Sequence, residues 1–239
     1  FLYCSSSAVE MSSTSVDGAA GSAYKTTYYS DGVETSSYES TWYDPIDYGY
    51  NCTFYGEELD FRNSAERIAR LYDSSTEIYD SVFQTSATES YNDDGSLDLS
   101  WSSQAPNFIA NNLDIYDAAV GHGLRIASTA TTAGTISLSN ISVDGVAGSG
   151  VRLENIDSET DADGNFSTTL SDITTSNNKL GLESINSKTS LSGLIASGNS
   201  YGMTCDTTTA FSPCESIDLT GNTDGEHQGC LDACEAITE

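Results

Sequence analysis

Residues 135–153, TISLSNISVDGVAGSGVRL, combine two short strand patterns with a turn between them. Ile136 and Leu138 alternate with small polar residues, and this period of two places both side chains on one face of a strand. Asp144-Gly145 is a turn signal, and the apolar alternation resumes at Val151. One such unit cannot bury its own apolar face, whereas stacked copies cover one another. The segment therefore predicts a β-solenoid.

The same pattern recurs along the chain from residue 97, at steps of 27, 27, 29 and 23 residues. Steps of this length leave room for strands and turns but not for crossover helices, so we expect parallel strands stacked coil on coil. The pattern predicts two columns of apolar residues: Leu97, Leu124, Val151, Leu180 and Met203 in the first, and Ile115, Ile141, Ile173 and Ile195 in the second.

The N-terminal segment 7–25 aligns with residues 134–152, so we expect the first coil to begin near the N-terminus. Residues 64–72 fit either a strand or a short helix capped by Ser64, and we favour the strand. The aligned pairs at the N-terminus are Val9 with Ile136, Met11 with Leu138, and Lys25 with Arg152.

Residues 26–58 interrupt the repeat with a tyrosine-rich stretch, which we interpret as an insertion projecting from the solenoid. Aromatic side chains offer flat amphipathic area, so the insertion would bind sugars or a protein partner. The alternative is that the aromatic rings pack against the solenoid wall, and both readings stay open. The candidate binding residues are Trp42, Tyr43, Tyr48 and Tyr50.

The composition excludes several functions. The 239 residues carry a formal net charge of −28, with only 8 Lys and Arg. Nucleic-acid binding needs clustered basic residues, and docking on an anionic membrane needs a basic surface. No apolar run is long enough to span a bilayer. The absence of an initiator Met predicts a processed or excised chain.

The six cysteines favour disulfides and an extracellular or cell-surface location. By proximity they pair as Cys4–Cys52, Cys205–Cys214 and Cys230–Cys234, with residues 205–239 as a cysteine-rich C-terminal cap. The alternative is a zinc site built by the last four cysteines and His227, but their spacing fits no standard zinc motif. Sequons for N-glycosylation occur at Asn51, Asn140 and Asn165.

The unit LSNISVDGVAGSGVRLEN, residues 138–155, resembles the repeat of right-handed parallel β-helix proteins of the pectin-lyase-like group. The resemblance implies a single all-β domain over residues 1–239, a right-handed parallel β-helix of roughly seven to eight coils. The fold hosts lyases, hydrolases, adhesins and structural proteins, so it does not specify the function.

Two short segments resemble polygalacturonase motifs, which would imply a glycoside hydrolase. Gly121-His122-Gly123 is similar to one of them, and Asn222-Thr223-Asp224 to the other. Their order along the chain is reversed, and four strand spacings would separate them by about 19 Å. Inverting carboxylates lie within about 10 Å of each other, so we predict a non-catalytic member and interpret His122 as an exposed turn residue. Arg125 and Arg152 are expected to stack outside and offset nearby carboxylates.

Glu159, Asp161 and Asp163 alternate before Gly164, as at the start of a calcium loop. The closing Glu is absent, because Leu170 occupies its position, and a solvated acidic loop is the alternative. Ca²⁺ is the one cofactor that the pattern suggests, and none is required.

We expect a structural or adhesive extracellular protein, a module of a cell-surface filament, sheath or appendage. Its partners would be other copies, end to end or laterally, and glycans. The alternative is a carbohydrate-active enzyme or carbohydrate-binding module of the same fold, with a glycoside hydrolase or polysaccharide lyase as the enzyme class.

Overall fold

The computed structural model describes residues 2–18, 22–30, 33–42, 46–64, 67–85, 95–118, 121–157, 159–160, 164, 166–234 and 237, with the backbone alone for residues 3, 22–30, 33–42, 47 and 48. Within these ranges the chain consists of strands, bridges, turns and loops, without helices. It follows that no described helix has the length and apolarity of a membrane span.

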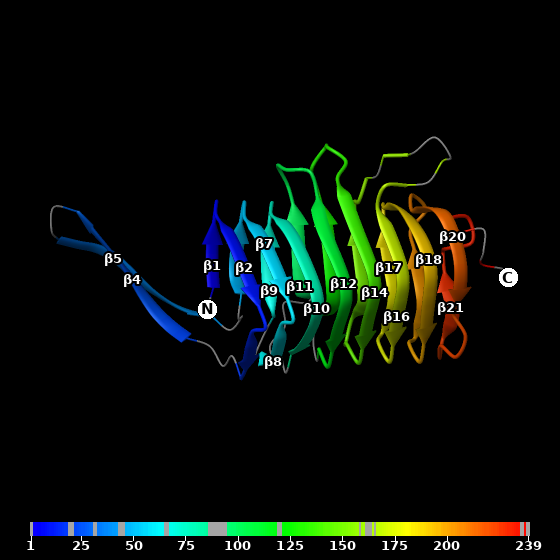
Figure 1. Ribbon diagram of the computed structural model, residues 1–239, viewed down its shortest axis with the longest axis horizontal. Coiled ribbons are helices and arrows are strands. Elements are labelled where there is room, and N and C mark those ends of the chain that lie inside the picture. Colours follow the sequence, from blue (N-terminus) through cyan, green and yellow to red (C-terminus); the bar gives the residue numbers. More distant parts are fainter. Residues whose placement is uncertain are drawn as a thin grey trace.

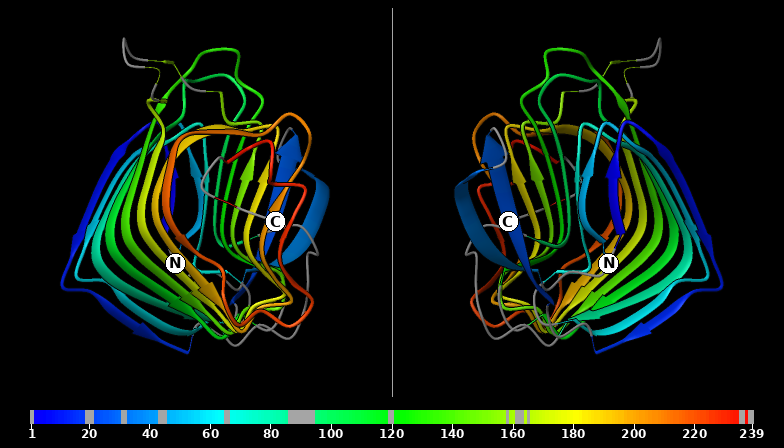
Figure 2. Two further views of the ribbon diagram at one scale, coloured as in Figure 1. Left: turned by 90° about the vertical axis from the view of Figure 1, so that its right-hand side faces the viewer. Right: turned by 90° about the vertical axis from the view of Figure 1, so that its left-hand side faces the viewer.

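Two long sheets of parallel strands run along the molecule, compatible with a β-helix or solenoid, and from β9 onward successive strands alternate between them (Figure 1). One strand of each sheet, with its connections, is called a coil here. Viewed along the stack, the coils lie one behind another (Figure 2). Sheet A contains, in order, β1 (Leu2–Ser5), β6 (Ile46–Tyr50), β9 (Ala69–Tyr72), β11 (Gly95–Trp101), β13 (His122–Ser128), β15 (Ser149–Glu154), β17 (Leu180–Ile185), β19 (Tyr201–Cys205) and β21 (Gly225–Gln228). Sheet B contains, in order, β2 (Ala8–Ser12), β7 (Thr53–Glu57), β10 (Ser75–Thr85), β12 (Asn107–Tyr116), β14 (Thr135–Asp144), β16 (Thr169–Ser176), β18 (Lys188–Ser197) and β20 (Ala210–Asp218). Off this path, β8 (Asp60–Ser64) pairs with β10, and β3 (Ser15–Asp17) pairs with β8.

The first predicted column of apolar residues is confirmed at Leu97, Leu124, Val151 and Met203 and is wrong by two residues at Leu180, where Leu182 takes the place. Leu97 pairs with Leu124, and Leu124 with Val151. Val151 then pairs with Leu182, whereas Leu180 pairs with Ser149. Because strand side chains alternate with a period of two, a shift of two keeps the same face inward, and the apolar pattern alone could not choose between the two leucines.

The second predicted column is corrected at two positions. Leu113, not Ile115, lies in register with Ile141 and Ile173, and Leu194, not Ile195, continues the column. Ile195 faces outward and is 50% exposed.

A left-handed residue bends each long strand of sheet B and explains this register. Its φ is positive, a conformation that Asn, Asp and Gly tolerate better than other residues. The pairing skips this position in each coil. The alternation of inward and outward side chains therefore shifts by one residue at the bend. The bend residues are Asp80, Asn112, Asn140, Asp172, Gly193 and Ser216.

The first coil begins at the N-terminus, as predicted. Val9 pairs with Phe54, whose column continues through Thr76 and Phe108 to Ile136. Lys25 does not continue the arginine column, because it lies in an antiparallel hairpin.

The projecting insertion is shorter than the predicted range 26–58. It contains the hairpin of β4 (Ser22–Ser30) and β5 (Val33–Trp42), which extends from the N-terminal end of the stack (Figure 1). The strands β6 and β7 belong to sheets A and B instead.

All six cysteines form disulfides, and one predicted pairing is confirmed. Cys4 bonds to Cys52. Cys205 bonds to Cys230 and Cys214 to Cys234, so pairing by sequence proximity is wrong for these four. The parallel stack brings the chain after β21 back over both β19 and β20. Cys230 and Cys234 are buried and close the C-terminal end of the core.

Candidate functional site

His122 is buried, which corrects the expectation of an exposed turn histidine. It is the first residue of β13, and its residue exposure is 5%. The backbone N–H of Ser149, one coil further, donates to Nδ1 at 3.0 Å, and Arg152 Nη1 lies 3.2 Å from Nε2. Burial, and then the positive charge of Arg152, lower the pKa of His122 to about 4. The imidazole is therefore neutral at neutral pH and has a structural contact on each ring nitrogen.

The outer face of sheet A carries a ladder of alternating charges. Arg125 pairs with Arg152 in register, as predicted, and the two offset the neighbouring carboxylates. Arg125 Nη1 lies 2.9 Å from Asp98 Oδ1, and Arg125 Nη2 lies 2.9 Å from Glu154 Oε2. Arg152 contacts Glu154 and lies 3.2 Å from Glu183.

The ladder neutralises its own charges. Burial alone would raise the pKa of Glu154, but the hydrogen bond and charge of Arg125, with the charge of Arg152, outweigh burial and lower this pKa. A general acid in glycoside hydrolysis needs a raised carboxyl pKa. The pKa of Glu154 is lowered instead, as expected for a carboxylate whose ion pairs connect neighbouring strands.

The two polygalacturonase-like segments do not meet. His122 begins β13, and Asn222 precedes β21, which is four strands away in sheet A. At the usual strand spacing this is about 19 Å. Asn222 instead belongs to a ladder of three asparagines that the sequence analysis missed.

Each asparagine of this ladder bonds two backbone groups in the same way. Asn178 Oδ1 accepts the N–H of Val146, and its Nδ2 donates to the carbonyl of Val143. Asn199 and Asn222 repeat both contacts one and two coils further. A sequence signal was present, since each residue begins an Asn-x-x-Gly segment: Asn178 to Gly181, Asn199 to Gly202, and Asn222 to Gly225.

The predicted calcium residues are only partly described. Glu159 is exposed, and its carbonyl accepts the backbone N–H of Ser167 at 2.9 Å, while Asp161 and Asp163 lie outside the described residues. Within the part of the chain that the structure describes, no three His, Cys, Asp or Glu side chains gather closely enough to hold a metal ion.

The predicted aromatic platform is described at only one of its four side chains, that of Tyr50, and stays a prediction. Tyr50 is 43% exposed on β6 and pairs with Tyr72 of sheet A. Trp42 and Tyr48 lie on β5 and β6 with only their backbone described, and Tyr43 lies outside the described residues.

Two of the three sequons lie on exposed bends. Asn51 and Asn140 are exposed and adopt positive φ. Asn140 Nδ2 also donates to Asn112 Oδ1 on the neighbouring coil. Asn165 lies outside the described residues.

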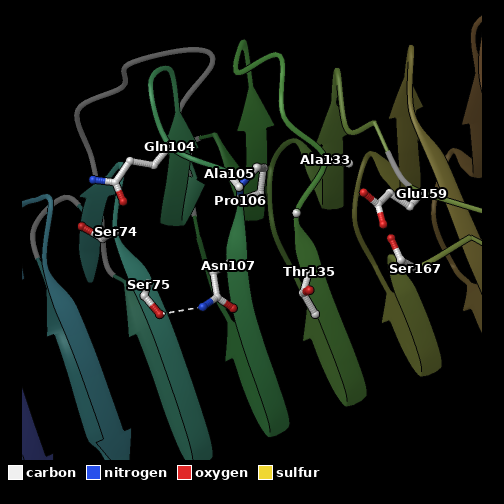
Figure 3. A pocket seen from close by; sticks show the side chains of 11 residues that line it. Ser74, Ser75, Gln104, Ala105, Pro106, Asn107, Ala133, Thr135, Glu159 and Ser167 are labelled. Atoms are coloured by element: carbon white, nitrogen blue, oxygen red, sulfur yellow. Dashed lines mark hydrogen bonds between the residues drawn. The ribbon is translucent and has the colours of Figure 1, made fainter.

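A polar groove crosses successive coils where the chain enters the strands of sheet B (Figure 3). Its volume is about 470 Å³. Ser75, Asn107 and Thr135, which begin β10, β12 and β14, are partners in register along it. The remaining lining residues are Ser74, Gln104, Ala105, Pro106, Ala133, Gly134, Glu159 and Ser167.

One wall of this groove is fixed by Asp73. Its Oδ1 accepts the backbone N–H groups of Ser102, Ser103 and Gln104 at 2.7, 2.9 and 3.2 Å. Burial alone would raise the pKa of Asp73, but these N–H groups and the Ser103 hydroxyl outweigh burial and lower it to about 2. The carboxylate therefore stays ionised and holds the loop that carries Gln104.

A scan against protein-family models and searches of curated proteins and of solved structures found no match. The functional assignment therefore depends on the geometry of this chain alone.

Proposed function

We propose that this protein is a structural and adhesive module of a cell-surface filament, sheath or appendage. In this proposal the two sheets form a right-handed parallel β-helix of roughly seven to eight coils, similar to the pectin-lyase-like group but non-catalytic. Buried columns run from coil to coil, and the charges on the outer face of sheet A pair with one another. The observation that carries the proposal is this in-register stack of nine strands in sheet A.

An extracellular location is supported by the three disulfides, which hint at an oxidising compartment. The net charge of −28 would keep such a surface soluble and give it an affinity for divalent cations. We include N-linked glycans on Asn51, Asn140 and Asn165, and Ca²⁺ at the Glu159 loop, as parts of the proposal.

Assembly through the N-terminal end is supported by the difference between the two ends. Val9, Met11 and Val16 of the first coil are only partly buried, whereas their partners one coil inward are buried. The C-terminal end is closed by buried Cys230 and Cys234. Exposed strand edges are ready templates for pairing, so we place the contact between copies at β2 and β3.

Electron microscopy of the purified native material tests this proposal. Fibres, arrays or end-to-end pairs are the expected result. A matched variant, Met11→Lys, places a charge on the first coil and should disperse the assemblies, while Ser171→Lys on the outer face of sheet B should leave end-to-end assemblies intact. Uniform monomers at all concentrations would refute the structural assignment.

The alternative function, a carbohydrate-active enzyme or binding module, is favoured by one observation, the polar groove across β10, β12 and β14. Incubation with a panel of neutral and acidic polysaccharides separates the two functions. Release of shorter or unsaturated products by the pure protein would establish the enzyme and overturn the non-catalytic assignment.

A further inference from the structure

Polar side chains repeat along the groove at the spacing of the strands. Ser75, Asn107 and Thr135 are consecutive partners in register, one from each coil. Ser167 continues the row, because it precedes Thr169, the partner of Ser137, by two residues. Neighbouring strands lie about 4.8 Å apart, so the row offers a hydrogen-bonding group every 5 Å or so. Such a row matches a linear ligand that extends along the stack.

Several of these groups have unused hydrogen-bonding capacity. Asn107 Nδ2 donates to Ser75 Oγ at 2.8 Å, which orients the amide and leaves its Oδ1 on the side toward Thr135 (Figure 3). Within the described residues, the hydroxyls of Thr135 and Ser167 and the carboxylate of Glu159 make no hydrogen bond, and all three side chains are exposed. The groove therefore presents donors and acceptors that a hydroxylated ligand can pair with.

The groove is preorganised on two sides. Asp73 holds the loop of Gln104 through three backbone N–H groups. On the floor, the N–H of Thr135 donates to the carbonyl of Pro106 at 2.8 Å, and a Cβ on Gly134 would collide with the Pro106 backbone. A binding surface that is already ordered loses less conformational entropy when a ligand binds.

The charge of the lining limits the ligand class. Among the described residues that line the groove, Glu159 is the only charged one, and no Lys or Arg accompanies it. A polyanion would meet this carboxylate and a chain of net charge −28. A peptide strand would need a free sheet edge, but the strands beneath the groove already pair on both sides.

We propose that this groove binds an uncharged oligosaccharide laid along the stacking axis, with Asn107, Thr135, Ser167 and Glu159 bonding the hydroxyls of successive sugar units. The inference rests on the adhesive part of the proposed function and supplies its ligand. It does not require assembly, because every lining residue belongs to one chain.

Isothermal titration of the protein with neutral hexasaccharides, in calcium-free buffer so that no Ca²⁺ occupies the Glu159 carboxylate, tests the site. The probes are cellohexaose, laminarihexaose and mannohexaose, with hexagalacturonate as the anionic comparison. We expect at least one neutral probe to bind and hexagalacturonate not to bind. Asn107→Ala should weaken binding about tenfold, as expected for the loss of one or two hydrogen bonds, and Glu159→Gln should weaken it less.

Asn111→Ala is the matched control. Asn111 lies on the same strand and also donates to a serine of a neighbouring coil, Ser139, but it lies outside the groove. This variant should lose the same kind of bond and keep full affinity. Equal losses in both variants, preference for hexagalacturonate, or no binding of any neutral probe would overturn the proposal.

The two proposals fail in different ways. Filaments seen by electron microscopy without any neutral-sugar binding would remove the groove assignment and leave the scaffold intact. Sugar binding that Asn107→Ala weakens, in a protein that never assembles, would keep the groove and remove the scaffold.

Discussion

Asn199 Oδ1 accepts the backbone N–H of Asn178 at 2.9 Å, and both residues are buried. Asn199 Nδ2 donates to the carbonyl of Thr175 at 3.2 Å. Both backbone groups lie where the chain passes from sheet B to sheet A, and they cannot reach water. The Asn199 side chain therefore supplies the hydrogen bonds that water would otherwise make.

Replacing this amide should strongly destabilise the protein. Asn199→Ala leaves the Asn178 N–H and the Thr175 carbonyl without these partners, at a cost of about 1–3 kcal/mol each. Urea unfolding should show a fall in the free energy of unfolding of about 3 kcal/mol, whereas Asn111→Ala on the outer face should cost less than about 1 kcal/mol. Similar losses in the two variants would contradict a structural role for the ladder.

Gly181 lets neighbouring coils approach each other closely. A Cβ at this position would lie 2.7 Å from Thr175 Oγ1 and would collide with the carbonyl oxygen of Gly202. Gly181→Ala should therefore destabilise the protein by about 1–3 kcal/mol through overpacking, measured by thermal or urea unfolding. Thr174→Ala, a change on the outer face of the neighbouring sheet, serves as the control. An unchanged free energy of unfolding in Gly181→Ala would show that the neighbouring backbones can move apart without loss of stability.

Sequence periodicity could predict the stack because apolar alternation is a direct consequence of strand geometry. The columns through Leu97, Leu124 and Val151 and through Val9 and Ile136 follow from that alternation alone. The pattern failed at Leu180 because an apolar residue two positions away satisfies it equally well. Glycines mark the register there, because Gly150 and Gly181 lie between paired residues of neighbouring strands, and a Cβ on Gly150 would lie 2.8 Å from Asn178 Nδ2 and 2.9 Å from the carbonyl oxygen of Gly181.

The candidate site was harder to predict because it depends on contacts across coils. The burial of His122 arises from the backbone of Ser149 and the side chain of Arg152, 27 and 30 residues away. The groove is formed by small and polar residues with no motif of their own, such as Asn107 and Thr135. Their alignment follows only once the register is known.

His122 should make the protein less stable in mild acid. Its pKa is about 4 in the folded protein and about 6.5 in an unfolded chain. Between these values the unfolded chain binds a proton that the folded protein does not, so the free energy of unfolding rises with pH. The stabilisation is complete above pH 6.5 and is lost as the pH falls toward 4, by up to about 3 kcal/mol.

Urea titrations at pH 7, 5.5 and 4 measure this loss. His122→Gln keeps an acceptor for the Ser149 N–H but cannot take up a proton, so its stability should change less over the same range. Parallel pH curves for the wild-type protein and the variant would exclude His122 as the titrating group.

Asp73 should stabilise the protein in a different pH window. Its pKa is about 2 in the folded protein and about 3.8 when unperturbed, so its contribution is present above pH 4 and is lost between pH 4 and 2. This difference corresponds to about 2 kcal/mol. Asp73→Asn should therefore cost about 2 kcal/mol at pH 7 and little at pH 2, measured by urea unfolding at both values. Hydrogen exchange at the amides of Ser102, Ser103 and Gln104 should accelerate in the same variant at pH 7, because their shared acceptor loses its charge. Unchanged exchange at these three amides would show that the loop is held by other contacts, and the groove wall would then not depend on Asp73.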